Sequence, residues 1–144
     1  MVKIAFDSNV LYSMFTDPKR IIHKAIDKKA QAKEIVVGVP KYCLLEIEPV
    51  FRDKLGEGWQ EHYETLLAWA KTHTHEIPLP RGHILKHYKD YTNDVFDIPI
   101  IASAMEWGAN YFVTGNLKHY NKEKIETHSR ILSLRQFLDY LLSI

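Results

Sequence analysis

Short apolar runs typical of buried strands alternate along this chain with longer segments of helical periodicity. The clearest four runs are Val2–Phe6, Ile35–Val39, Asn110–Val113 and Arg130–Leu132. Strands that alternate with helices usually lie parallel in one sheet, because each helix carries the chain back to the edge where the last strand began. The pattern therefore predicts an α/β fold with a mainly parallel central sheet.

Helical segments fill the intervals between these runs. We expect helices over residues 8–15, after Asp17-Pro18, and over 41–55, 59–72, 82–91, 97–107 and 134–142, with a short extended piece at 76–80. Pro49 lacks a backbone donor inside the third of these helices, so we expect a kink or a break there. No linker, repeat or change of composition divides the chain, which predicts one domain over residues 1–144.

Charge and cysteine content narrow the functional classes. Nineteen Lys and Arg against 18 Asp and Glu give a net charge of +1, so the chain lacks the strongly basic surface of a protein held to nucleic acid by charge alone. Nucleic-acid contact would have to be local or metal-assisted. Cys43 is the one cysteine, which excludes an intramolecular disulfide and suits a reducing, cytoplasmic environment. No apolar run approaches a membrane span, and no signal peptide is visible.

Polar side chains follow the predicted strands at the positions where parallel sheets bind ligands. Asp7 comes directly after the first strand, and Thr114 and Asn116 form the turn after Asn110–Val113. Each also has a plain structural explanation, since Asp is a favoured helix cap and Asn tolerates tight turns. The sequence favours a common site because these far-apart segments all end at the same predicted edge.

Further acidic residues stand at the start of, or within, predicted helices. Glu46 lies among apolar neighbours, although a solvated helix face is also compatible with it. Asp94 and Asp97 precede a very apolar helix, whose N-terminus favours acidic groups. Converging carboxylates repel one another and need a cation. Oxygen ligands of this kind suit Mg²⁺ or Mn²⁺.

Four short motifs, in order, resemble those of PIN-domain ribonucleases. They are Phe6–Leu11, Leu45-Glu46, Asp97–Ala104 and Gly108–Asn116. The resemblance implies a three-layer α/β/α sandwich and metal-dependent hydrolysis of phosphodiester bonds, usually in RNA. Many small members of the family are VapC-type toxins of toxin–antitoxin pairs, and many form homodimers. We therefore expect an RNA substrate, an antitoxin partner that covers the acidic pocket, and a homodimer.

The resemblance also suggests a role for each residue of the site. In our hypothesis Asp7, Glu46 and Asp97 hold one Mg²⁺ or Mn²⁺, and a water activated by this ion attacks the scissile phosphate. Asn116 and Asp94 would complete the metal shell. Asn116 stands where the family often has Asp, which weakens the case for a second tightly held ion.

Two residues are expected to orient the metal ligands through hydrogen bonds, and a basic segment lies beside the site. Asn9 and Thr114 are the candidate orienting residues. Lys118, His119 and Tyr120 follow the Asn116 turn and suit contact with single-stranded RNA, although an ordinary solvated loop explains them equally well.

Two functional classes are alternatives to a metal-dependent nuclease. A haloacid-dehalogenase-like phosphatase would need an Asp two residues after Asp7, where Asn9 stands. A stronger alternative is a catalytically weak or inactive PIN-like module that binds RNA or a partner protein. The departure at Asn116 supports this alternative, whereas the presence of Asp7, Glu46 and Asp97 supports the enzyme.

Overall fold

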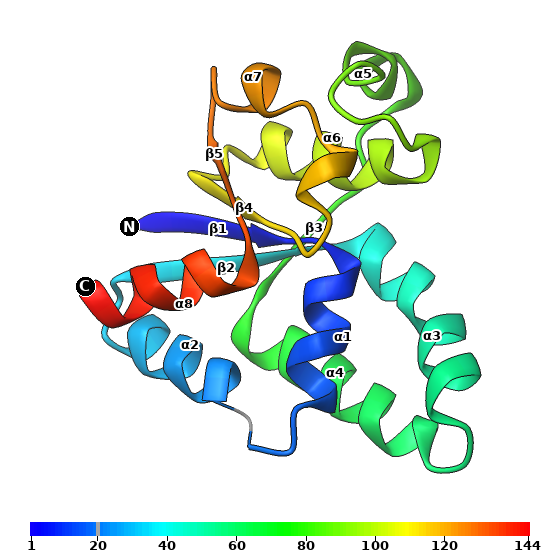
Figure 1. Ribbon diagram of the computed structural model, residues 1–144, viewed down its shortest axis with the longest axis vertical. Coiled ribbons are helices and arrows are strands. Elements are labelled where there is room, and N and C mark those ends of the chain that lie inside the picture. Colours follow the sequence, from blue (N-terminus) through cyan, green and yellow to red (C-terminus); the bar gives the residue numbers. More distant parts are fainter. Residues whose placement is uncertain (20) are drawn as a thin grey trace.

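A single parallel sheet forms the centre of the computed structural model, which describes residues 1–19 and 21–144 (Figure 1). Its strands are β1 (Val2–Phe6), β2 (Ile35–Pro40), β3 (His75–Ile77), β4 (Tyr111–Val113) and β5 (Arg130–Leu132). The strand order is β3-β2-β1-β4-β5, and every pairing is parallel. The prediction of a mainly parallel sheet is confirmed.

Helices cover both faces of this sheet. They are α1 (Ser8–Thr16), α2 (Ile21–Gln31), α3 (Lys41–Leu55), α4 (Trp59–His73), α5 (Gly82–His87), α6 (Ile98–Trp107), α7 (Lys122–Ile125) and α8 (Leu134–Ser143). In Figure 1, α5 and α6 lie above the sheet, and α2, α4 and α8 lie below it, which confirms the three-layer α/β/α sandwich. Within residues 1–19 and 21–144, no helix is both long and apolar enough to cross a membrane.

The central strand places one residue of the candidate site at the point where strand order reverses. Ile4, Ala5 and Phe6 are fully buried, since β1 is covered on both faces and both edges. The chain builds outward from β1 through β2 and β3 on one side, and through β4 and β5 on the other. Asp7 follows β1 directly, and ligands of open α/β sheets bind at this kind of position.

Helix α3 runs unbroken through Pro49, so of the kink or break expected there, the break is wrong. The missing proline N–H deprives the carbonyl of Leu45 of its helical partner. Leu45 is 68% exposed, and Pro49 is also exposed. Water can therefore satisfy the freed carbonyl, and the helix continues.

The predicted helix over residues 82–91 is shorter than expected, because α5 ends at His87. Thr92 pairs with Tyr120 in an isolated antiparallel bridge, and the carbonyl of Tyr91 accepts a hydrogen bond from the backbone N–H of Asn121. This long-range pairing uses backbone groups that would otherwise form the next helical hydrogen bonds. The segment around Tyr120 also forms the 3₁₀ turn Leu117–His119 and α7. The sequence pattern predicts neither of them.

One glycine allows a close approach between α6 and the sheet. A Cβ built on Gly38 of β2 would lie 2.6 Å from the ring of Trp107 and 2.8 Å from the side chain of Ile77. Such distances are far below van der Waals contact, so only glycine fits here without movement of the ring. Gly38 therefore sets how closely the Trp107 end of α6 can pack.

Candidate functional site

A cavity of about 200 Å³ opens beside the carboxyl end of β1. Four candidate site residues line it, and they come from four distant segments: Asp7, Glu46, Asp97 and Asn116. Asn9 also lines the cavity. The structure thus brings together the four residues that the sequence motifs singled out as candidate catalytic groups.

Asp7 is held in one orientation by three hydrogen bonds. Its side chain is almost fully buried, and Oδ1 accepts from the backbone N–H of Ser8 at 2.7 Å. Oδ2 accepts from Thr114 Oγ1 and from Tyr120 Oη, each at 2.8 Å. A carboxylate offers about four lone-pair positions, so roughly one remains for a ligand. Burial raises the pKa of Asp7, and these three donors oppose that effect.

Glu46 is linked to Asp7 through Ser8. The hydroxyl of Ser8 donates to Glu46 Oε1 at 2.8 Å, while its backbone N–H donates to Asp7. Burial raises the pKa of Glu46, and the neighbouring charges of Asp7 and Asp94 raise it further. The two carboxylates therefore share Ser8 as one orienting residue.

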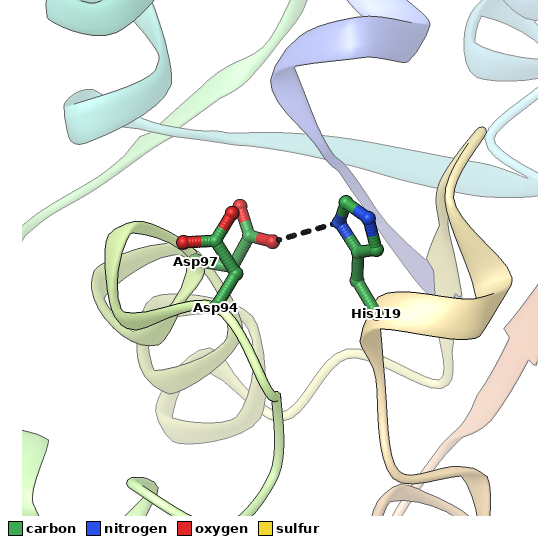
Figure 2. A group of neighbouring side chains, drawn as sticks. All are labelled: Asp94, Asp97 and His119. Carbon is green, nitrogen blue, oxygen red and sulfur yellow. Dashed lines mark ion pairs between the residues drawn. The ribbon is translucent and has the colours of Figure 1, made fainter.

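Asp97 carries a strongly raised pKa at the mouth of α6. Its pKa is raised to about 7, first by burial and then by the charges of Asp7, Asp94 and Glu46, with His119 acting in the opposite direction. Figure 2 shows Asp94 and Asp97 on one side and His119 facing them, with 3.6 Å between His119 Nδ1 and Asp97 Oδ2. Ligand atoms of these three residues lie within 4.8 Å of one another, a spacing that could hold a metal ion.

The turn after β4 is tied to the start of α1. Asn9 Oδ1 accepts from the backbone N–H of Gly115 at 2.9 Å, and Asn9 also lines the cavity. Thr114 Oγ1 donates to Asp7 and accepts from the backbone N–H of Asn116 at 3.0 Å. These contacts fit the orienting positions that the motifs suggest for Asn9 and Thr114.

The basic segment beside the cavity divides into exposed and buried parts. Lys118 is exposed, and the His119 side chain is 44% exposed. Tyr120 is 7% exposed, with its ring against Phe112 and its hydroxyl on Asp7. The prediction of Tyr120 as an RNA contact is therefore wrong for this structure, because its ring offers no open face for stacking. The sequence carries no signal for this inward role, which depends on how the 117–121 turn folds back.

Apart from the contact between His119 and Asp97, no basic side chain of the described residues pairs with the carboxylates of the cavity. Across residues 1–19 and 21–144, neither Lys nor Arg forms an ion pair with Asp7, Glu46 or Asp97. Three acids with raised pKa values and oxygen donors fit a hard divalent cation such as Mg²⁺ or Mn²⁺, which would favour their ionised forms. Water would complete the coordination shell.

Comparison with solved structures identifies the class of fold. A chain of VapBC2 from Rickettsia felis, solved bound to a DNA fragment from their promoter, matches with a TM-score of 0.61 and 13% identity over 92% of this chain and 98% of that chain. PAE2754 from Pyrobaculum aerophilum matches with a TM-score of 0.67 and 13% identity, over 99% and 97%. DNA-bound VapBC from Salmonella typhimurium gives 0.62 and 15%, over 92% and 98%.

These likenesses confirm the predicted PIN-like fold, and the VapBC structures agree with the resemblance to VapC-type proteins seen in the motifs. No protein-family model matches the chain. No curated protein is similar to it in sequence.

Proposed function

We propose that this chain is a Mg²⁺- or Mn²⁺-dependent ribonuclease built as one PIN-like domain over residues 1–144. The observation that carries the proposal is the meeting of Asp7, Glu46 and Asp97 in one cavity without a Lys or Arg ion pair from the described residues. The likeness of the fold to VapBC chains supports it.

The residues of the cavity divide into ligands and orienting groups. Asp7, Glu46 and Asp97 would hold the ion, and Asn116 and Asp94 would complete its surroundings. A divalent ion at this place lowers the pKa of an attacking water and offsets the charge that develops on the phosphate.

The chain's own contacts fix the ligands before any ion arrives. Thr114 and Tyr120 hold one oxygen of Asp7 by hydrogen bonds, and Ser8 holds Glu46 beside it. Ligands held this way need little rearrangement on binding, which favours affinity and a defined geometry.

Cleavage of pooled cellular RNA tests the proposal. Purified protein is incubated with Mn²⁺, Mg²⁺ or EDTA, and Asp97→Asn is run beside it with Asp139→Asn as the matched control, since Asp139 is exposed on α8. We expect discrete metal-dependent products from the wild type and from Asp139→Asn, and none from Asp97→Asn. Equal cleavage by all three proteins would overturn the assignment of Asp97.

A second candidate function is an inactive PIN-like module that binds RNA or a partner protein. Asn116 favours it, because an amide supplies an oxygen ligand without the charge of Asp. A Mn²⁺ titration separates the two candidates. Tight binding that requires Asp7 and Asp97 supports the enzyme, while a cavity that takes no ion supports the module.

We also propose that the chain is the toxin of a toxin–antitoxin pair, cytoplasmic and homodimeric. The likeness to VapBC chains supports this. An antitoxin would cover the acidic cavity, ideally with a basic side chain. Induced expression of the wild type and of Asp97→Asn tests the toxin role: growth arrest by the wild type alone supports it. The mass in solution tests the dimer.

A further inference from the structure

The cavity that holds the acidic residues has a second, basic end. Tyr12, Val50 and Lys54 line it together with the carboxylates. Glu46, Val50 and Lys54 are four residues apart on α3, so they form one stripe along that helix. Asn9 and Tyr12 of α1 form the facing wall, because α1 and α3 pack against each other (Figure 1).

Lys54 is held at its end of the cavity and kept apart from the acids. Its Nζ lies 5.1 Å from the centre of the Tyr12 ring, a cation–π contact that restrains a flexible side chain. Among residues 1–19 and 21–144, Lys54 forms no ion pair, and its charge is not among those that act on Glu46 or Asp97. The ammonium therefore remains available to an anionic group of a ligand.

The acidic and basic residues of the cavity are separated along α3. Eight residues of α-helix lie between Glu46 and Lys54, a backbone rise of roughly 12 Å. A nucleic-acid strand carries one phosphate for each nucleotide, so a strand with its scissile phosphate at the carboxylates presents further phosphates beside it. Lys54 is placed to meet one of these further phosphates.

From this arrangement we propose that Lys54 binds a neighbouring phosphate of a single-stranded nucleic acid whose scissile phosphate lies at Asp7, Glu46 and Asp97. Tyr12 positions the ammonium through the cation–π contact. A cavity of about 200 Å³ between two helices admits one backbone, which is why the occupant is a single strand. This inference rests on the proposed function and adds the path of the substrate along α1 and α3.

The test compares a substrate with one phosphate and a substrate with several. The first is bis(p-nitrophenyl) phosphate, and the second is a short single-stranded RNA, both with Mn²⁺. The variants are Lys54→Met, which keeps the aliphatic stem, and Lys54→Arg, which keeps the charge. Arg52→Met is the matched control, since Arg52 lies on the same helix but is exposed and paired with Glu48 and Asp53.

We expect Lys54→Met to lower the ratio of kcat/KM on RNA to kcat/KM on bis(p-nitrophenyl) phosphate about five- to tenfold. Lys54→Arg should restore most of that ratio, and Arg52→Met should leave it unchanged. Binding of a short phosphorothioate RNA, which resists cleavage, should lose about 0.7 from the slope of log K against log salt in Lys54→Met, the amount for one phosphate contact.

The outcomes separate this inference from the proposed function. Hydrolysis with an unchanged ratio and an unchanged salt slope in Lys54→Met would overturn the Lys54 contact and leave the nuclease standing. A salt slope that depends on Lys54 in a protein that hydrolyses neither substrate would support the contact and overturn the nuclease. A duplex that binds as tightly as the single strand, with the same dependence on Lys54, would overturn the single-strand assignment.

Discussion

Replacing Asp97 by Asn should stabilise the metal-free protein while removing its response to Mn²⁺. The pKa of Asp97 is about 7 in the folded protein, against 3.8 for a free side chain, because burial and three nearby carboxylates disfavour its charge. A raised pKa means that the folded state holds the proton more tightly than the unfolded state. The resulting stability is fully present below the ordinary pKa and is lost as the pH rises through about 7.

The size of the effect follows from the same values. The difference between about 7 and 3.8 corresponds to at most about 4 kcal/mol, at about 1.4 kcal/mol for each pKa unit. Asp97 is only half-buried, so solvent screening and local relaxation reduce this to about 1–2 kcal/mol. For a chain of this size that amounts to a change in Tm of about 3–6 °C.

Thermal and urea unfolding followed by circular dichroism measure the prediction. At pH 8 in EDTA, Asp97→Asn should unfold at a higher temperature than the wild type, and the difference should narrow as the pH is lowered from 8 to 5. Mn²⁺ at about 100 times its Kd should add about 2.7 kcal/mol to the wild type and little to the variant. Asp139→Asn serves as the control for loss of an exposed carboxylate. A variant that is less stable than the wild type in EDTA at pH 8 would refute the electrostatic reasoning.

Three further predictions follow from the same contacts. Tyr120→Phe removes one donor to Asp7 while keeping the ring, so calorimetry should show Mn²⁺ affinity reduced about tenfold or more; unchanged affinity would mean that the hydroxyl does not orient Asp7. Mn²⁺ competes with a proton on Asp97, so its affinity should rise about fivefold between pH 6 and pH 7 and level off above pH 8; a flat titration would contradict the pKa of about 7. Gly38→Ala forces a Cβ into the Trp107 ring, so urea unfolding should show a loss of about 1–3 kcal/mol.

Local patterns in the sequence were enough for most of the fold and for the acids of the site. Val2–Phe6 matches β1 residue for residue, and Lys41–Leu55 matches α3. The helix expected over residues 134–142 matches α8, which begins with a full capping box at Ser133. These features depend on side-chain periodicity and on capping within a few residues, both of which can be read from neighbouring letters.

Features that depend on which distant segments meet were not predictable in this way. Helix α5 is shorter than the helix predicted over residues 82–91, because Thr92 pairs with Tyr120 across the fold. Helix α3 survived Pro49 because that face of the helix points to solvent, which its local sequence does not state.

By itself the sequence determined the α/β class and the order of the elements. It also placed Asp7, Asp97 and Asn116 at the ends of elements and Glu46 within a helix, since these are local features. Only the tertiary structure decided that Tyr120 points inward onto Asp7 and that Lys54 shares a cavity with the acids. The reason is physical: the orientation of a side chain in a packed cavity depends on every segment that surrounds it, and those segments are far apart along the chain.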